Sequence, residues 1–224
     1  MSARALILQH GDWGPPGVLA EWADARGIGF DVHHAEHSGD LPAFNGQAFV
    51  ASLGSPHNPS DLDVPQVRAE MAWLRQAIEH DVPVLGLCFG GQALAAAMGG
   101  TIERAPQAEL GWGAIRSRVP DEVPEGPWLQ WHYDRFTLPP GAEQLAESDA
   151  GVQAFRHGRH LGVQFHPEST IEIVRLWAQS DHERLSALGM EDGEALLERG
   201  RHHAAAARDA AFRLFDAFWQ RART

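Results

Sequence analysis

The 224-residue sequence has one cysteine, no lysine and no long hydrophobic run, and each shortage excludes a class of protein. The lone cysteine, Cys88, excludes an internal disulfide framework and a metal site built from several cysteines. All 18 basic residues are arginine, which excludes a Schiff-base lysine and a phosphate-loop lysine. The 13 histidines lack the spacing of a zinc-binding helix, and no glycine-rich nucleotide motif is present. We therefore expect neither a metal nor another cofactor.

The formal net charge is −12, and the acidic residues are spread along the chain. A nucleic-acid partner would require a cluster of basic residues, which the sequence lacks. A solvated acidic surface that keeps the protein soluble explains the charge. The N-terminus enters a strand-like segment without the apolar stretch of a signal peptide, and no apolar run is long enough to span a membrane. These features predict a cytoplasmic protein with no nucleic-acid or membrane partner.

Strand patterns alternate with helical patterns in the first half of the chain. This alternation is typical of right-handed βαβ units and a parallel sheet with helices on its faces. The expected strands cover residues 5–9, 30–34, 48–53 and 82–87, and the expected helices cover residues 18–26, 66–80 and 91–98. We predict an α/β fold with a mostly parallel sheet and helices on both faces.

The second half has a different character. Short strand candidates separated by turns predict a small, more antiparallel strand layer, and they cover residues 101–104, 113–118, 152–156 and 161–165. A helical C-terminus is expected from about residue 181 to residue 224, with helices over 195–208 and 210–221 whose aromatic side chains pack in the core. The length suits a single domain, residues 1–224.

The sequence Gly-Leu-Cys-Phe-Gly at residues 86–90 has the form of a nucleophile elbow. A buried strand leads into it and a helix follows, so Cys88 would lie at a helix N-terminus. The helix dipole and the free N–H groups there favour thiolate over thiol. The N–H of Phe89 would point to where an oxyanion forms. The alternative is that Cys88 is an inert core residue, as many free cysteines are.

The sequence His-Pro-Glu at residues 166–168 ends an apolar strand. Residues two apart in an extended chain point to the same side, so Glu168 can reach the ring of His166 and hold its tautomer. His166 could then act as base and acid for a thiol. The alternative is a surface turn with a solvated glutamate. The apolar strand before the motif and the cysteine elbow elsewhere in the chain weaken that alternative.

A third motif, Gly-Ser-Pro at residues 54–56, follows the third expected strand. A glycine at the carboxyl edge of a parallel sheet can present its N–H to the crevice where ligands bind. Gly54 could therefore be a second oxyanion donor. Taken alone, Gly-Ser-Pro indicates only a turn.

In this order along the chain, the three motifs resemble those of class I glutamine amidotransferases. The resemblance covers about residues 5–180 and implies the flavodoxin-like fold of class I glutaminases. It implies a catalytic triad of Cys88, His166 and Glu168, with Cys88 as the nucleophile. It also implies an oxyanion hole formed by the amides of Gly54 and Phe89.

Further residues are implied to bind the substrate. Gln92, one helical turn after Cys88, matches the family glutamine that contacts the amino-acid end of the substrate. The segments Glu-Leu-Gly-Trp at 109–112 and Trp-His-Tyr-Asp at 131–134 look closest to the glutaminase part of GMP synthase and its free-standing relatives. This likeness implies pocket roles for Tyr133 and Asp134. Asp134 could pair with the substrate ammonium, or it could be a strand-end charge or a fold-stabilising acceptor.

Three functions from two classes are compatible with these residues. The first is a glutaminase that releases ammonia for a partner synthase, since no synthetase domain follows in this sequence. We favour it and expect low turnover until a partner completes the oxyanion hole at the flexible Gly54 backbone. The second is a stand-alone hydrolase of γ-glutamyl peptides or amides that forms the same thioester. The third is a non-catalytic binding or regulatory subunit, which the intact triad argues against.

Overall fold

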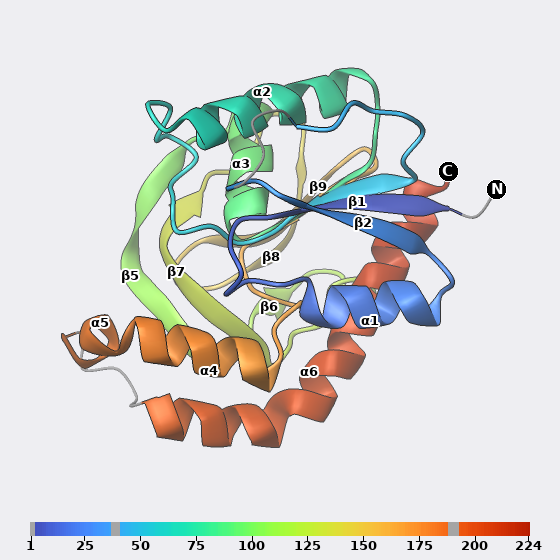
Figure 1. Ribbon diagram of the computed structural model, residues 1–224. Helices are drawn as coiled ribbons and strands as arrows, with labels where there is room; N and C mark the ends of the chain where they lie inside the picture. Colours follow the sequence, from blue (N-terminus) through green and yellow to red (C-terminus); the bar gives the residue numbers. More distant parts are fainter. Residues whose placement is uncertain (1–2, 37–40, 188–192) are drawn as a thin grey trace.

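A twisted eight-stranded sheet forms the centre of the molecule (Figure 1). The computed structural model describes residues 3–36, 41–187 and 193–224. The strand order is β2-β1-β3-β4-β10-β9-β8-β6. The strands are β1 Arg4–Gln9, β2 Gly29–His34, β3 Phe49–Ser52, β4 Val84–Leu87, β6 Arg116–Ser117, β8 Glu143–Glu147, β9 Val152–His157 and β10 His160–Val163.

The five strands from β2 to β10 in this order are parallel. They have the flavodoxin-like order 2-1-3-4-5, with β10 in the fifth position. The central strands β3 and β4 are buried at every residue, as expected for parallel strands covered on both faces. The predicted parallel sheet is therefore confirmed.

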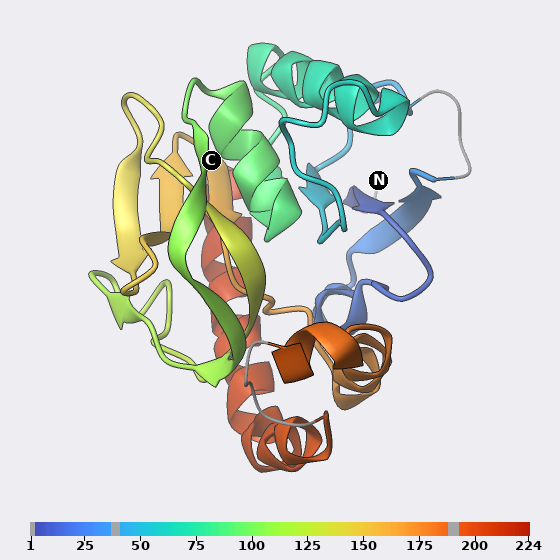
Figure 2. The same cartoon turned by 90° about the vertical axis from the view of Figure 1, so that its left-hand side faces the viewer.

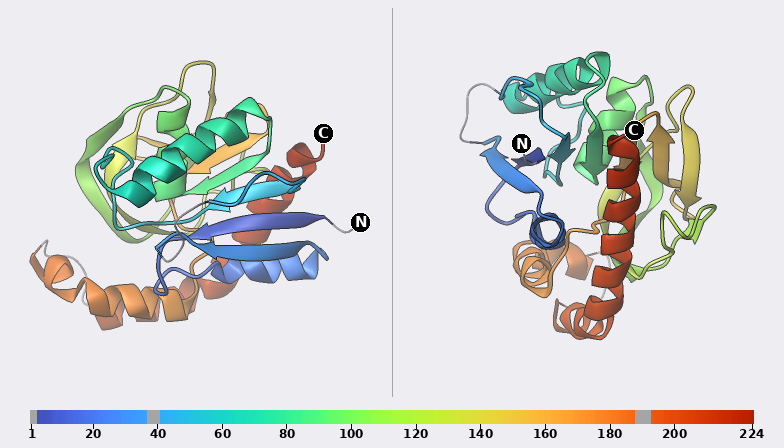
Figure 3. Two further views of the ribbon diagram at one scale, coloured as in Figure 1. Left: turned by 45° about the horizontal axis from the view of Figure 1, so that its top comes forward. Right: turned by 90° about the vertical axis from the view of Figure 1, so that its right-hand side faces the viewer.

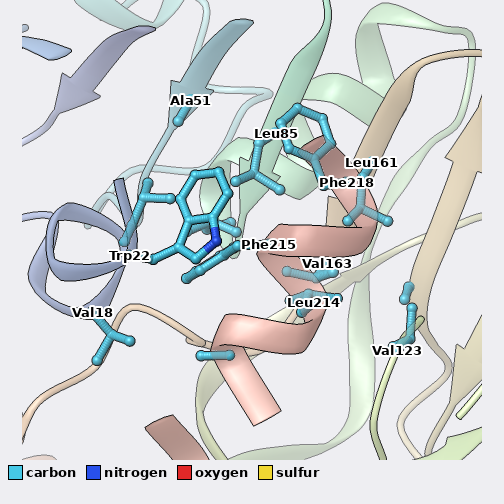
Figure 4. Close-up of a cluster of buried hydrophobic side chains, with 14 of the residues drawn as sticks. Val18, Trp22, Ala51, Leu85, Val123, Leu161, Val163, Leu214, Phe215 and Phe218 are labelled. Atoms are coloured by element: carbon cyan, nitrogen blue, oxygen red, sulfur yellow. The ribbon is translucent and has the colours of Figure 1, made fainter. Parts of the chain in front are cut away.

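Helices cover both faces of this sheet (Figures 1 and 3). One face is covered by α1 (Gly17–Ala25) and α6 (Gly193–Ala222), and the other by α2 (Pro65–Glu79) and α3 (Phe89–Ala97). On the face covered by α1 and α6, the rings of Trp22 and Phe215 are in contact, with centroids 5.6 Å apart (Figure 4). Burial of these large apolar side chains fixes the helices on the sheet.

A separate two-stranded antiparallel sheet lies beside α3 (Figure 2). It consists of β5 (Ile102–Gly113) and β7 (Trp128–Phe136). The sequence predicted only residues 101–104 of β5 and missed β7 and β8. The predicted strand over 113–118 is wrong as one continuous strand, because Gly113 ends β5 and only Arg116–Ser117 forms β6. These strands are stabilised by pairing and packing with distant segments, which a local pattern does not reveal.

The C-terminal region contains α4 (Ile171–Ser180), α5 (His182–Ala187) and α6. The predicted break between residues 208 and 210 is wrong, since α6 continues there and neither glycine nor proline lies at these positions. Residues 188–192 of the predicted helical extension lie outside the described residues. Within the described ranges, no helix combines the length and the apolar character needed to cross a membrane.

The three motifs meet at one edge of the sheet. They follow β3, β4 and β10, which are neighbours in the order of strands. Ser52 is paired with Gly86, and Gly86 is paired with Gly162, so these strands end side by side. Ligands of open α/β sheets bind at this carboxyl edge. The fold therefore brings together residues that are far apart in the sequence.

Candidate active site

Cys88 occupies the sharp turn between β4 and α3. Its backbone angles, φ 50° and ψ −106°, are unusual for a residue with a side chain and are typical of strained functional turns. Cys88 is the N-cap of α3, where unpaired helix N–H groups and the dipole stabilise a negative charge. The side-chain amide of Gln164 donates a hydrogen bond to the sulfur over 3.8 Å. The helix N-terminus and the Gln164 amide thus both present N–H groups towards the sulfur.

Two glycines after the cysteine allow α3 to begin directly on the sheet. A Cβ on Gly90 would collide with the carbonyl oxygen of Ser52, and one on Gly91 would collide with that of Val163. Only glycine permits such close backbone contact. The Gly-Gly pair thus holds the turn at Cys88 against the ends of β3 and β10.

His166 follows β10, and its backbone N–H donates to the carbonyl of Leu129 over 2.9 Å. Its ring Nδ1 donates to Oε1 of Glu168 over 2.7 Å, and both side chains are buried. The contact predicted from the two-residue spacing is confirmed. The second ring nitrogen, Nε2, has no hydrogen-bond partner in the described part of the chain. This nitrogen is therefore available for proton transfer.

The charge state of His166 is set by its two neighbours. Burial alone would lower its pKa, but the negative charge of Cys88 and the charge and hydrogen bond of Glu168 raise the pKa of His166 to about 10. Because Nε2 makes no hydrogen bond to any described residue, we attribute the influence of the sulfur to its charge. An imidazolium beside a thiolate is the resting form that a cysteine nucleophile requires.

The oxyanion hole of Gly54 and Phe89 stays a prediction, and the structure gives the backbone surroundings of both residues. Phe89 is the first residue of α3, so its N–H has no acceptor within the helix. Gly54 lines the cavity beside Cys88. The carbonyl of Leu53 accepts the N–H of Gly90 over 3.2 Å. Since the C=O and N–H of a trans peptide point in opposite directions, the N–H of Gly54 is directed away from that bond.

A cavity of about 340 Å³ opens between these groups, which is within the range of small-molecule sites. It is lined by four of the predicted site residues and by three tryptophans, namely Gly54, Cys88, Tyr133, His166, Trp13, Trp131 and Trp177. Among the described residues, no cluster of three or more histidine, cysteine, aspartate or glutamate side chains is arranged to hold a metal ion.

A family model for class I glutamine amidotransferases matches residues 31–174. The chain belongs to this family. The glutamine-hydrolyzing GMP synthase of Alkalilimnicola ehrlichii is 39% identical over 146 residues, which cover 57% of this chain and 26% of that protein. The corresponding enzyme of Thiobacillus denitrificans is 31% identical over 189 residues, which cover 76% of this chain and 35% of that protein. The chain thus spans between a quarter and about a third of the length of these relatives.

Solved structures match almost the whole chain. A glutamine amidotransferase from Methylobacillus flagellatus has a TM-score of 0.90 and 28% identity, covering 98% of this chain and 95% of that one. A glutamine amidotransferase from Thermotoga maritima has a TM-score of 0.88 and 21% identity, covering 98% and 99%. The flavodoxin-like class I glutaminase fold is confirmed.

The three residues that the family resemblance implied to bind the substrate have different surroundings. Tyr133 lines the cavity, whereas Gln92 and Asp134 are not among the described residues that line it. The side-chain amide of Gln92 donates to the carbonyl of Asp134 over 3.1 Å. The carboxylate of Asp134 accepts from Asn58 over 3.0 Å and from Arg104 over 3.4 Å. Direct contacts of Gln92 and Asp134 with a class I substrate remain predictions.

Two tryptophans of the cavity are not predicted as site residues by the sequence. Trp13 follows β1 and Trp177 lies on α4, and the indole N–H of Trp177 donates to the carbonyl of Trp13 over 2.9 Å. The only signal in the sequence was its total of 8 tryptophans, which does not say which of them gather. In this amidotransferase, their position beside His166 depends on contacts between distant segments.

Proposed function

We propose that this protein hydrolyses the side-chain amide of glutamine through a γ-glutamyl thioester on Cys88. The observation that carries the proposal is the buried 2.7 Å contact between His166 and Glu168, beside a cysteine at a helix N-terminus that lines the same cavity. Nucleophilic catalysis by a thiol requires these three parts: a nucleophile, a base and a group that orients the base.

In the first half-reaction, the thiolate of Cys88 attacks the γ-carbonyl carbon of glutamine. The oxyanion that forms is stabilised by the N–H groups of Gly54 and Phe89. As the tetrahedral intermediate collapses, His166 gives its Nε2 proton to the leaving nitrogen and the C–N bond breaks. Ammonia leaves, and the γ-glutamyl group remains bound to sulfur.

In the second half-reaction, the neutral His166 removes a proton from a water molecule that attacks the thioester. The same two amides stabilise the second oxyanion. The C–S bond breaks, glutamate leaves, and the thiolate and imidazolium are restored. Throughout, Glu168 keeps a proton on Nδ1 and holds the ring in place.

The ammonia is proposed to serve a synthase partner. The curated relatives named above are GMP synthases that hydrolyse glutamine, and this chain matches between 26% and 35% of their length. That partial match supports a role in supplying ammonia to a synthase, as the sequence predicted.

Incubation of the purified protein with glutamine tests the proposal. Glutamate and ammonia should appear in equal amounts, and Cys88→Ala should abolish both while the melting temperature stays close to that of the wild type. Cys88→Ser should be nearly as inactive, because a hydroxyl is far less acidic than a thiol. Turnover by pure Cys88→Ala protein would contradict the covalent mechanism.

The tryptophans of the cavity favour a second candidate function, hydrolysis of γ-glutamyl amides with an apolar amine. The ring of Trp177 lies edge-on to His166 with centroids 4.6 Å apart, and it also contacts Trp131 at 5.7 Å and Trp13 at 6.3 Å. His166 is the group that would protonate the leaving amine. An apolar amine would bury surface against these rings, whereas ammonia would not.

A comparison of glutamine, γ-glutamylethylamide and γ-glutamylbenzylamide separates the two functions. The glutaminase proposal expects glutamine to have the highest kcat/KM. The second candidate expects the benzylamide to exceed both others, with the advantage reduced in Trp177→Ala. The ethylamide controls for the effect of any substituent on the leaving nitrogen.

A further inference from the structure

A second buried histidine–glutamate pair lies next to the candidate active site and has no part in the mechanism above. His10 follows β1, Glu70 lies on α2, and Nε2 of His10 donates to Oε2 of Glu70 over 2.6 Å. The hydroxyl of Ser52 on β3 donates to the other carboxylate oxygen over 2.6 Å. His10 is 6% exposed, Glu70 2% and Ser52 0%. Three elements are therefore joined by one buried carboxylate.

The other nitrogen of His10 reaches the loop that holds the predicted oxyanion donor. Nδ1 of His10 donates to the carbonyl oxygen of Gly54 over 3.1 Å. A carbonyl can only accept, so Nδ1 carries a proton, and a carboxylate at Nε2 requires a proton there as well. Burial lowers the pKa of His10, but the charge and hydrogen bond of Glu70 outweigh it and raise that pKa. The ring also lies edge-on to Phe89, with centroids 5.0 Å apart.

Both peptide units around Gly54 are anchored as a result. The carbonyl of Leu53 is held by the N–H of Gly90 over 3.2 Å, and the carbonyl of Gly54 is held by His10 over 3.1 Å. Glycine without such contacts could rotate its peptides at little cost. The peptide flip at Gly54 that the sequence predicts would have to break these hydrogen bonds.

We propose that His10, held by Glu70 and Ser52, is a positioning residue that fixes Gly54 so that its N–H can stabilise the oxyanion. This inference rests on the proposed function, because it assigns a role in the same acyl transfer. His10 reaches the reacting atoms only through the Gly54 backbone. Its loss should therefore affect steps that form an oxyanion and leave the thiolate itself intact.

Two reactions of Cys88 distinguish a loss of oxyanion stabilisation from a loss of the thiolate. Hydrolysis of glutamine passes through tetrahedral oxyanions, whereas alkylation by iodoacetamide is a direct displacement at carbon that forms none. Both require the thiolate of Cys88. A positioning role of His10 therefore predicts a loss of hydrolysis without a loss of alkylation.

A matched pair of variants tests the contact. His10→Asn places an amide N–H near the position of Nδ1, whereas His10→Gln extends its amide towards Glu70 and leaves the carbonyl of Gly54 without a donor. We expect His10→Gln to lower kcat/KM for glutamine by about 10- to 100-fold, mostly through kcat. His10→Asn should retain more of the activity. Alkylation of Cys88 should stay within about twofold of the wild type in both.

Glu70 provides the second test should the His10 variants not fold. Glu70→Gln can still accept from Ser52 and contact His10, so it should retain more activity than Glu70→Ala. His160→Gln, at a buried histidine outside the cavity, is the control and should leave kcat/KM unchanged. Melting temperatures of all variants show whether they are folded.

The outcomes separate this inference from the proposed function. Equal kcat/KM for the wild type and His10→Gln, or a parallel loss of hydrolysis and alkylation, would overturn the positioning role alone. A wild-type protein that hydrolyses neither glutamine nor the γ-glutamyl amides would overturn the proposed function and this inference with it. Selective loss of hydrolysis in His10→Gln, recovered in His10→Asn, is the result we expect.

Discussion

Two buried histidine–glutamate pairs contact Gly54 from different directions, and they differ in what their histidines can do. A Cβ on Gly54 would lie 3.0 Å from the ring of His166, whereas the carbonyl of Gly54 is bonded to His10. The His166 ring is bonded to Glu168 through one nitrogen only, and its Nε2 has no hydrogen-bond partner among the described residues. The His10 ring has both nitrogens occupied, by the Gly54 carbonyl and by Glu70. A histidine with a free nitrogen can transfer a proton, and one with none can only hold its neighbours.

The comparison extends to a third buried histidine that lacks a bonded carboxylate. Nδ1 of His160 has no hydrogen-bond partner within the described residues, and burial lowers the pKa of His160 to about 4. The pKa of His166, bonded to Glu168, is raised to about 10. The bonded carboxylate of Glu168 thus accounts for part of the opposite pKa shifts of His166 and His160.

His166→Ala should have the largest effect, because it removes a cavity-lining ring whose Nε2 has no hydrogen-bond partner among the described residues and can transfer a proton. We expect kcat/KM for glutamine to fall by about 10⁴-fold or more, as for the histidine of other triads. The same steady-state assay on His10→Gln should give a far smaller loss. Comparable losses in the two variants would erase the distinction between a catalytic and a positioning histidine.

Glu168→Gln should cost less than His166→Ala. The carboxylate orients the ring and stabilises its positive charge, but it does not transfer the proton. The loss should be visible in kcat/KM, together with slower alkylation by iodoacetamide because the imidazolium is less stable. A Glu168→Gln variant as inactive as His166→Ala would argue against these separate roles.

Gly54→Ala should lower kcat by a smaller factor, because the new methyl group would press on the ring of His166. The added methyl group would lie 3.0 Å from Cε1 of His166, so the ring must shift by a few tenths of an ångström. The bond from His10 to the Gly54 carbonyl can remain. We expect kcat to fall by roughly tenfold with little change in melting temperature. Unchanged kcat would mean that the ring position tolerates this shift.

The smallest expected effect is on the pH dependence of the free energy of unfolding, through the titration of His160. Because its folded pKa is about 4 and its ordinary value is 6.5, the unfolded chain binds a proton more readily than the folded one between these values. Stability should fall by about 2 kcal/mol from this residue as the pH drops from 7 to 5. Urea denaturation at both pH values should show a smaller fall in His160→Gln. The charged His166 contributes with the opposite sign, since its stabilisation is complete below pH 6.5 and is lost as pH rises through 10.

Whether the sequence predicts a contact depends on how many residues separate the two contacting side chains along the chain. Residues 166 and 168 are two apart on an extended segment, so their contact was predictable from the chain direction alone. The parallel order of strands was predictable because each strand alternates with a helix. The pairing of His10 with Glu70 spans 60 residues and requires β1 and α2 to be packed against each other, which no local pattern indicates. The same reason hid the β5–β7 sheet and the meeting of Trp13 with Trp177.

The central claim is that Cys88 carries the γ-glutamyl group during turnover, and acid quenching followed by mass spectrometry tests it most directly. Wild-type protein mixed with glutamine and quenched during turnover should contain a fraction of chains heavier by one γ-glutamyl group, and peptide mapping should place that group on Cys88. Glu168→Gln should show the same adduct, and Cys88→Ala should show none. Release of ammonia with no adduct on Cys88, at the same rate in Cys88→Ala as in the wild type, would contradict the account.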